Sequence, residues 1–263
     1  MSPKVYIVGA GPGDPELMTL KAARIVREAG LVLFTGSLVP RNVVEGAAEG
    51  AQVVDSKGMT LEEIVDLMLA AIRRGDDVAR VHTGDPSLFG STAEQVRRLE
   101  REGVEVEIVP GVSSFAAGAA AIGRELTLPE LSQTVIITRA EGRTPMPPRE
   151  DLPSLASHGA TMALFLSIGL LDKVVQELTP AYGADCPIAV IHKASRPDQV
   201  VIISTLAEIE ERVREAQIKA TAMILVGRVL TATDFADSRL YAADFSHRFR
   251  RASAEPGRDG SQS

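Results

Sequence analysis

The first half of the chain alternates short apolar runs with longer stretches in which apolar residues recur at helical spacing. We expect strands at residues 4–8, 31–35, 51–55, 77–82 and 104–109, and helices at 16–30, 60–75 and 91–103. Strands that alternate with helices in this way form parallel βαβ units. The first half is therefore predicted to be an α/β lobe with a mainly parallel sheet.

The helix at 60–75 has the clearest boundary signals. Thr60 and Glu63 have the spacing of a capping box, and Gly75 follows the last turn. One stripe at helical spacing is apolar and is expected to pack on the sheet: Leu61, Ile64, Val65, Met68 and Ile72. Two further capping boxes are expected from the same spacing: Ser91 with Glu94, and Thr205 with Glu208.

The second half begins with a run of small residues at 110–123, expected to be helical, and a connector at 124–133. Apolar runs then predict strands at 134–138, 161–167, 187–192, 199–205 and 221–227, and helical stretches at 168–178 and 205–216. The turn at 193–198 is too short for a crossover helix, so the strands on either side of it are expected to be antiparallel. The second sheet is therefore predicted to be mixed.

These patterns divide the chain into two α/β lobes. The N-terminal lobe is expected at residues 1–118 and the C-terminal lobe at 119–249, with the active-site cleft between them, a common place for a ligand. The last residues, 250–263, are polar and rich in Gly and Ser, and we expect them to form a disordered tail.

The composition excludes several kinds of site. The chain has 263 residues, of which 45% are hydrophobic and 24% charged, as in an ordinary globular protein. A single cysteine, Cys186, allows no intrachain disulfide and no thiolate cluster, and the histidines are scattered, so no metal site is predicted. No apolar run reaches the ~20 residues of a membrane span, and no signal segment is recognised. We expect a cytoplasmic protein without a membrane partner.

The charge argues against a nucleic-acid partner. Proteins that bind nucleic acids neutralise phosphates with clustered Lys and Arg. This chain has a net charge of −7, and its basic residues gather only in the short stretch at 246–252. A small-molecule ligand is therefore the better expectation.

A glycine-rich loop follows the first strand, with Gly9 and Gly11 near its start. A dinucleotide fingerprint would need a further glycine at position 14 or 16, and these positions hold Asp14 and Glu16. A carboxylate there would also repel a pyrophosphate at the same backbone N–H groups. The next lysine, Lys21, lies inside a helical pattern, so a Walker loop is excluded. The loop is either a tight turn that uses glycine for its backbone freedom, or it binds an uncharged or cationic ligand.

Two more turn-like stretches follow strands of the same predicted sheet. Residues 83–90 read TGDPSLFG after the fourth strand, and residues 109–114 read VPGVSS after the fifth. Each stretch alone is typical of an ordinary turn. Parallel sheets present their ligand sites at the carboxyl ends of the strands, so the glycine loop and these two stretches are expected to line a single rim.

Taken together, GAGPGDPELMT, TGDPSLFG and VPGVSS closely resemble the motifs of the tetrapyrrole methylases, and the resemblance covers residues 4–250. It implies a two-lobed α/β fold that differs from the Rossmann methyltransferase fold, and S-adenosylmethionine as the methyl donor. Three shorter stretches resemble the branch of the family that methylates C-11 of precorrin-4 in cobalamin biosynthesis: residues 36–41, 132–147 and 244–250.

The resemblance also implies which residues contact the donor, which members of the family hold in a folded shape between the lobes. The matching positions are Pro12, Thr83, Gly84, Asp85, Leu88, Ser113 and Ser114, with Ile168 and Ala189 from the second lobe. Glycines allow close backbone approach, and the hydroxyls and Asp85 can bond ribose or amino-acid groups. A carboxylate near a sulfonium is electrostatically tolerable, whereas beside a pyrophosphate it would not be.

The implied reaction transfers a methyl group from sulfur to a ring carbon by in-line displacement. Alignment of the two reactants can then supply most of the catalysis. A proton must also leave, and Asp85 and His82 are the candidate bases. For His82 the alternative interpretation is a buried residue at the end of a strand, bonded only to backbone.

A tetrapyrrole substrate carries many carboxylates, which guanidinium groups bind well. The candidate substrate-binding residues are the arginines of the stretches that resemble the precorrin-4 branch: Arg41, Arg139, Arg143 and Arg248. For each of them the alternative is a solvated surface arginine. The proline-rich segment at 143–150 is expected to be either a lid over the substrate or a connector.

Other functions stay open on the residues alone. Within the family, a methylase acting on cobalt-precorrin-4 or on uroporphyrinogen III also fits the motifs, whereas a diphthamide-pathway or ribosomal-RNA methylase fits the net charge poorly. A nucleotide-dependent oxidoreductase is the alternative from another class, and Asp14 argues against it. A non-catalytic binding module would be expected to lose the loop motifs. The resemblance further implies a homodimer.

Overall fold

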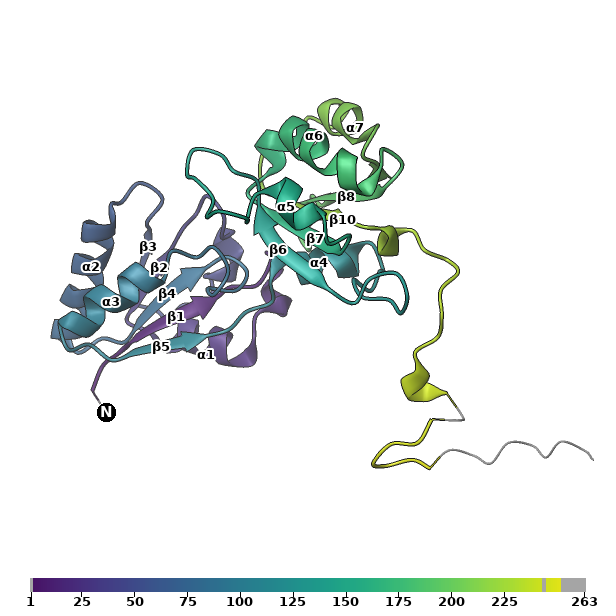
Figure 1. The fold of residues 1–263 in the computed structure, drawn as a ribbon. Coiled ribbons are helices and arrows are strands. Elements are labelled where there is room, and N and C mark those ends of the chain that lie inside the picture. Colours follow the sequence, from purple (N-terminus) through teal and green to yellow (C-terminus); the bar gives the residue numbers. More distant parts are fainter. Residues whose placement is uncertain (1, 243–244, 252–263) are drawn as a thin grey trace, which may run out of the picture.

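The structure, a computed structural model, describes residues 2–242 and 245–251 and has two lobes (Figure 1). The first lobe contains a five-stranded sheet in the order β3-β2-β4-β1-β5, and all of its pairs are parallel. Its strands are β1 (Val5–Gly9), β2 (Leu31–Phe34), β3 (Gln52–Asp55), β4 (Val78–His82) and β5 (Val106–Val109). The expected parallel sheet is confirmed, and β1 pairs with β4 on one side and with β5 on the other.

Helices cover both faces of this sheet because side chains alternate along its strands. Figure 1 shows α1 (Leu20–Glu28) on one face, and α2 (Leu61–Arg74) and α3 (Ala93–Arg101) on the other. Val8 packs with the α1 side, whereas Ile7 packs with the α2 and α3 side. The sheet is thus the middle layer of three, which leaves the ends of its strands free to carry ligand loops.

The ends of α2 confirm the sequence signals, and the start of α3 corrects one. Thr60 and Glu63 form the capping box, and Gly75 ends α2 in the left-handed conformation with a φ of 91°. The box expected at Ser91 with Glu94 is wrong, because α3 begins after Thr92 without a side-chain cap. Ser91 has a φ of 49°, far from the extended backbone that an N-cap needs.

The second lobe contains a five-stranded sheet in the order β6-β7-β10-β8-β9. Its strands are β6 (Val135–Arg139), β7 (Thr161–Phe165), β8 (Pro187–His192), β9 (Val200–Thr205) and β10 (Ala222–Val226). The pair β6–β7 is parallel and the other three pairs are antiparallel. The predicted mixed sheet and the antiparallel pair β8–β9 are therefore confirmed.

Helices again lie on both faces of this second sheet. The cluster around Met162 and Ile188 holds α5 (Leu152–Ala156), α6 (Leu171–Tyr182) and α7 (Ile209–Glu215). The small-residue helix α4 (Ser114–Ala121) packs on the opposite face, where Gly118 lies against Met223. The expected lobe division between residues 118 and 119 falls inside α4.

The capping box expected at Thr205 with Glu208 is wrong. Thr205 is the last residue of β9 and pairs with Pro187 in the sheet, so it is not free to begin a helix. Helix α7 begins only at Ile209, and its N-cap, Glu208, makes no side-chain cap bond. Short 3₁₀ helices complete the described elements: η1 (Pro15–Leu17), η2 (Arg41–Val43), η3 (Ile168–Leu170), η4 (Arg228–Leu230) and η5 (Arg239–Tyr241).

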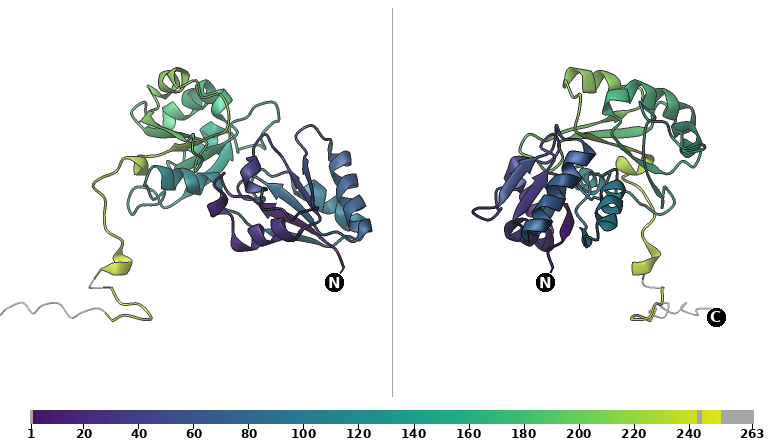
Figure 2. Two further views of the ribbon diagram at one scale, coloured as in Figure 1. Left: turned by 180° about the vertical axis from the view of Figure 1, so that it is seen from behind. Right: turned by 90° about the vertical axis from the view of Figure 1, so that its left-hand side faces the viewer.

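Beyond η4 the chain leaves the second lobe and extends away from both lobes, as the two views of Figure 2 also show. The expected disordered tail, 250–263, lies outside the described residues from position 252 onward. Among the residues that are described, no helix combines the length and the apolar character needed to cross a membrane.

Candidate functional site

The three loops singled out in the sequence follow three neighbouring strands of the first sheet. The strands lie in the order β4-β1-β5, so their carboxyl ends form one continuous rim. Gly11 and Gly84 join the first two loops through a pair of backbone bonds, Gly11 N–H to Gly84 O at 3.2 Å and the reverse at 2.8 Å. The prediction that the loops converge is therefore confirmed by this geometry.

Glycine is required where the loops cross. A Cβ placed on Gly9 would lie 2.6 Å from the backbone nitrogen of Gly111 and 2.7 Å from the carbonyl oxygen of Gly84. Such separations are well inside van der Waals contact, so no side chain fits there. The glycine loop thus serves the approach of the three backbones to one another.

Asp85 connects the second loop to the third. Its carboxylate accepts the Gly111 N–H at 3.0 Å and the Ser87 N–H at 2.8 Å, and it is also bonded to the Ser87 hydroxyl. Burial opposes ionisation of this group, but the bonds from Ser87 and Gly111 together outweigh that effect and lower the pKa of Asp85. The carboxylate is therefore negatively charged, and much of its hydrogen-bonding capacity serves the loops.

The cavity beside these loops, called the donor cavity below, lies between the two lobes. Eight of the nine residues expected to contact the cofactor line it: Pro12, Thr83, Gly84, Asp85, Leu88, Ser113, Ser114 and Ile168. Ala189 does not line it. That residue is fully buried inside β8, and Ile191, two positions further along the same strand, faces the cavity instead.

Sequence reasoning missed most of the contribution of the second lobe. The turn between β8 and β9 supplies Lys193, Ala194 and Arg196 to the donor cavity, and the start of β10 supplies Ala222 and Met223. The sequence signal for this contribution is the basic character of the stretch KASRPD, which contains Lys193 and Arg196.

The same turn joins the lobes directly. The Asp14 N–H donates to the Ser195 hydroxyl at 3.1 Å, and the guanidinium of Arg196 donates to the Leu38 carbonyl. Phe89 of the first lobe also meets Phe165 of the second, with ring centroids 5.1 Å apart. These contacts hold the two walls of the donor cavity together.

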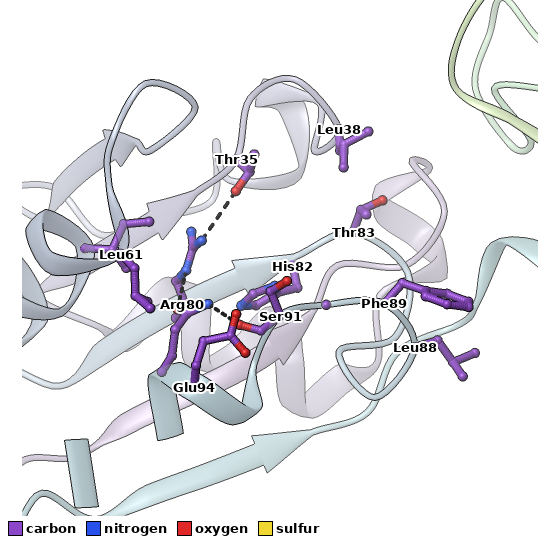
Figure 3. Close-up of a pocket in the computed structure, with 13 residues that line it drawn as sticks. Thr35, Leu38, Leu61, Arg80, His82, Thr83, Leu88, Phe89, Ser91 and Glu94 are labelled. Carbon is purple, nitrogen blue, oxygen red and sulfur yellow. Dashed lines mark hydrogen bonds between the residues drawn. The ribbon is translucent and has the colours of Figure 1, made fainter. Parts of the chain in front are cut away.

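A second cavity adjoins the donor cavity on the first-lobe side, and the two share Leu38, Thr83, Leu88 and Phe89. Figure 3 shows it with Arg80 and His82 at its base and Glu94 on its wall. Arg80 and His82 are two residues apart on β4, so their side chains lie on the same face of the sheet. We call this space the Arg80 cavity.

His82 is poorly suited to act as a base. Its side chain is buried, and desolvation, assisted by the charge of Arg80, lowers its pKa to about 3. The imidazole is therefore neutral near pH 7 and binds a proton only weakly. Its Nε2 atom has no hydrogen-bond partner among the described residues. Asp85, with its lowered pKa and occupied oxygens, is equally unsuited to remove a proton.

The four candidate substrate-binding arginines are not brought together. The guanidinium of Arg139 donates to the carbonyls of Ala140, Thr144 and Pro145, so it organises its own loop. Arg41 and Arg143 are exposed, and neither lines the donor cavity or the Arg80 cavity.

The position of Arg248 does not fit the predicted role in substrate binding. The segment that carries it, residues 245–251, extends away from both lobes (Figure 1). The guanidinium of Arg248 lies 5.4 Å from the ring centroid of its neighbour Phe249. Within one chain it does not reach the cleft. No group of three or more metal-binding side chains is present among the residues that the structure describes.

Comparison with known protein families identifies the family of this chain. A family model described as Tetrapyrrole (Corrin/Porphyrin) Methylases matches residues 4–210. The chain belongs to this family of methyltransferases, so the expected enzyme class and the resemblance of the three loop motifs are confirmed.

Individual relatives match nearly the whole chain. The precorrin-4 C(11)-methyltransferase of Pseudomonas aeruginosa is 53% identical over 94% of this chain and 98% of its own length. The cobalt-precorrin-4 C(11)-methyltransferase of Methanocaldococcus jannaschii is 48% identical over 95% of this chain and 96% of its own length.

Solved structures agree with the sequence relatives. A cobalt precorrin-4 methyltransferase described as a cobalamin biosynthetic enzyme superposes with a TM-score of 0.85 at 47% identity, over 87% of this chain and 96% of the other. The uroporphyrin-III C-methyltransferase of Thermus thermophilus, in complex with S-adenosylhomocysteine, gives a TM-score of 0.72 at 32% identity, over 87% of this chain and 93% of the other. The expected two-lobed α/β fold is confirmed.

Proposed function

We propose that this protein transfers a methyl group from S-adenosylmethionine to C-11 of precorrin-4, a step of cobalamin biosynthesis. The observation that carries the proposal is the similarity over nearly the full length to relatives named for this reaction, the first of them 53% identical. The donor cavity supports it, because the loops that define the family lie on one rim and face the second lobe.

The residues of the donor cavity fit S-adenosylmethionine. Ser113 Oγ is buried without a hydrogen-bond partner among the described residues, so a polar group of a ligand would satisfy it. Asp85 contributes negative charge that favours a sulfonium. Apolar side chains complete the walls, among them Leu88, Ile168 and Met223. A cavity with apolar walls and a few polar groups is the usual environment of a nucleoside ligand.

When bound, S-adenosylmethionine supplies a methyl group that is already activated, so the protein needs no strong nucleophile of its own. The task of this chain is then to hold and align the reactants. The crossing of the loops at Gly9, Gly84 and Gly111 fixes one wall of the cavity. Phe89 and Leu166, both exposed and in left-handed backbone conformations, present apolar surface towards the cleft and help to exclude water.

The oxidoreductase alternative loses support from the geometry at Asp14. The carboxylate of Asp14 accepts the N–H of Glu16 at 2.9 Å and so occupies a backbone donor that a pyrophosphate would need. The helix that follows, η1, has only three residues. A dinucleotide site of the usual kind is therefore disfavoured.

The reaction is tested by incubating the protein with S-adenosylmethionine labelled with ¹³C in the methyl group and with precorrin-4. We expect one labelled methyl, which carbon NMR places at C-11. Parallel reactions with cobalt-precorrin-4 and uroporphyrinogen III test the two alternatives within the family. A label at another carbon would refute the proposed position, and no transfer to any of the three would refute the function. The Gly9→Ala variant, in which the loops of the donor cavity are disturbed, is the control and should transfer less of the label.

We also propose a cytoplasmic homodimer. Strand β9 is at the edge of the second sheet, and Val200, Val201 and Ile203 on it are exposed. An exposed apolar edge strand is avoided in isolated proteins because it pairs with other chains. Light scattering coupled to size-exclusion chromatography should give twice the chain mass of 28.0 kDa. A mass of one chain would contradict the dimer without affecting the proposed reaction.

A further inference from the structure

Arg80 is a buried cation without a buried anion. Its side chain is only 4% exposed. Its partners are all neutral: Gln95 Oε1 at 3.1 Å, Ser56 Oγ at 2.9 Å, the Leu33 carbonyl at 3.4 Å and Thr35 Oγ1 at 3.4 Å. No carboxylate lies within ion-pair distance of it in the described part of the chain. Burying an unpaired charge is costly, so such a group is expected to meet a counter-ion in the working protein.

The charge persists despite burial. Desolvation lowers the pKa of Arg80 to about 10, which still leaves the guanidinium protonated near pH 7. The four neutral acceptors receive four of the five N–H groups of the guanidinium, so one N–H on Nη2 has no acceptor of its own. Figure 3 shows the guanidinium directed towards Thr35, at the side of the cavity away from Glu94.

His82 adds a second unsatisfied group to the same cavity. Its Nε2 is buried and has no partner among the described residues. Because the imidazole is neutral near pH 7, Nε2 can carry a proton and donate it to an acceptor. One N–H of Arg80 and the Nε2 of His82 therefore lack the same kind of partner, an oxygen that accepts hydrogen bonds, and a carboxylate brings two.

We propose that the Arg80 cavity binds one carboxylate side chain of the substrate, with Arg80 and His82 as the groups that recognise it. The proposal rests on the proposed function, which supplies a ligand with several such side chains. The cavity, about 280 Å³, is large enough for a short acid side chain, and it shares Thr83, Leu88 and Phe89 with the donor cavity. A carboxylate held there would place the attached ring beside the donor.

Glu94 is the acidic residue on the wall of this cavity, and it offers the competing explanation. If Glu94 moved to pair with Arg80, the cavity would need no carboxylate from a ligand. The two possibilities differ in the effect of Glu94→Gln. If Arg80 binds a carboxylate of the ligand, removing the negative charge of Glu94 removes a repulsion and should leave the binding of that ligand unchanged or strengthen it. If Glu94 pairs with Arg80 instead, Glu94→Gln breaks this ion pair and should disturb the site.

The experiment uses the full chain and two probes that require no turnover. Uroporphyrin, which carries eight carboxylates, reports on the substrate side by its fluorescence, and S-adenosylhomocysteine reports on the donor side by calorimetry. Arg80→Lys keeps the positive charge but loses the planar guanidinium with its several N–H groups. His82→Phe keeps an aromatic ring but loses the N–H that can donate a hydrogen bond to a carboxylate. We expect each variant to raise the Kd for uroporphyrin roughly tenfold and to leave the Kd for S-adenosylhomocysteine within about twofold.

Controls separate this result from general damage. Arg98→Lys makes the same replacement at an exposed arginine of α3, which is paired with Glu62, and should change neither Kd. Uroporphyrin octamethyl ester, which has no free carboxylates, should bind wild type weakly and should not distinguish the variants. If Arg80→Lys fails to fold, His82→Phe decides alone.

The proposal is overturned by any of three outcomes: wild type does not bind uroporphyrin, His82→Phe binds it as wild type does, or Glu94→Gln weakens it as much as Arg80→Lys. None of these outcomes bears on the proposed reaction, which is judged by the labelled methyl. In turnover with precorrin-4, the same variants should raise KM for precorrin-4 more than they lower kcat.

Discussion

The carboxylate of Asp85, in the loop after β4, accepts a hydrogen bond at 3.0 Å from the backbone N–H of Gly111, in the loop after β5. This bond crosses β1, which lies between those two strands in the sheet. Gly11, in the loop after β1, is in turn bonded to Gly84, the neighbour of Asp85. The three loops are therefore one connected unit, and the donor cavity depends on all three.

Asp85→Asn should loosen this unit. The neutral amide accepts hydrogen bonds less strongly than a carboxylate, and its NH₂ group cannot accept at all. We expect the affinity for S-adenosylhomocysteine, measured by calorimetry, to fall about tenfold or more, since bonds to charged groups are the strong ones. Asp66→Asn, on the exposed side of α2, is the matched control and should bind as wild type does. Equal affinities for all three proteins would contradict a bracing role for Asp85.

The pH dependence of stability should reveal the same carboxylate. Because the pKa of Asp85 is lower in the folded protein, its ionisation stabilises the fold above the unfolded pKa, about 3.9, and this contribution disappears as the pH falls through the folded value. Other acids share this behaviour, so the comparison is between wild type and Asp85→Asn. We expect their difference in Tm to be constant above roughly pH 5 and to shrink below that pH. A difference that grows in acid would mean that the pKa is raised.

Gly9→Ala should disturb the loop crossing. The added methyl group would lie 2.6 Å from the backbone nitrogen of Gly111 and 2.7 Å from the backbone oxygen of Gly84. Because both are backbone atoms, the clash can be relieved only if the loops move. We expect a loss of about 1–3 kcal/mol in the free energy of unfolding, measured with urea. Gly58→Ala is the control, because a Cβ at Gly58 meets no atom within 4 Å. Should both variants unfold alike, the crossing would not be a tight contact.

The sequence predicted the first-lobe wall of the site well, because short stretches of sequence are enough to recognise the strands and loops that form this wall. Each loop follows a strand of a parallel sheet, and the rule that ligands bind at the carboxyl ends of such strands predicted the single rim that the three loops form. The individual residues on it, such as Pro12, Thr83 and Ser113, were implied by the family resemblance, and they line the donor cavity. The Thr60 capping box was predicted for the same reason, since both partners lie within four residues. Ser91 shows the limit of such patterns, because a left-handed backbone at that position overrides the capping spacing.

The second-lobe wall depended on tertiary structure and was predicted poorly. Ala189 and Ile191 lie on the same face of β8 and in the same cluster, so the face alone does not decide which of them lines the cavity. The choice depends on which part of the strand lies beside the first lobe, and the local sequence gives no sign of that position. The role of Arg196 depends on Leu38, which is 158 positions away in the sequence. Of the pair Arg80 and His82, which lies within the buried strand β4, the sequence predicted a role only for His82.

Phe89→Ala should weaken donor binding more than it destabilises the fold. Phe89 is 46% exposed and contacts Phe165 of the other lobe, so the fold depends little on its burial, whereas the donor cavity loses a wall. Aromatic pairs contribute about 0.5–1.5 kcal/mol beyond burial. We expect a loss of that size in the binding of S-adenosylhomocysteine, which is a roughly two- to thirteenfold higher Kd. The free energy of unfolding should change by less than about 1 kcal/mol, because an exposed side chain contributes little to stability. Phe249→Ala, at an 86% exposed residue far from the cleft, should change neither quantity. If the loss appears in the free energy of unfolding instead of the Kd, then Phe89 contributes to the stability of the fold and not to the binding of the donor.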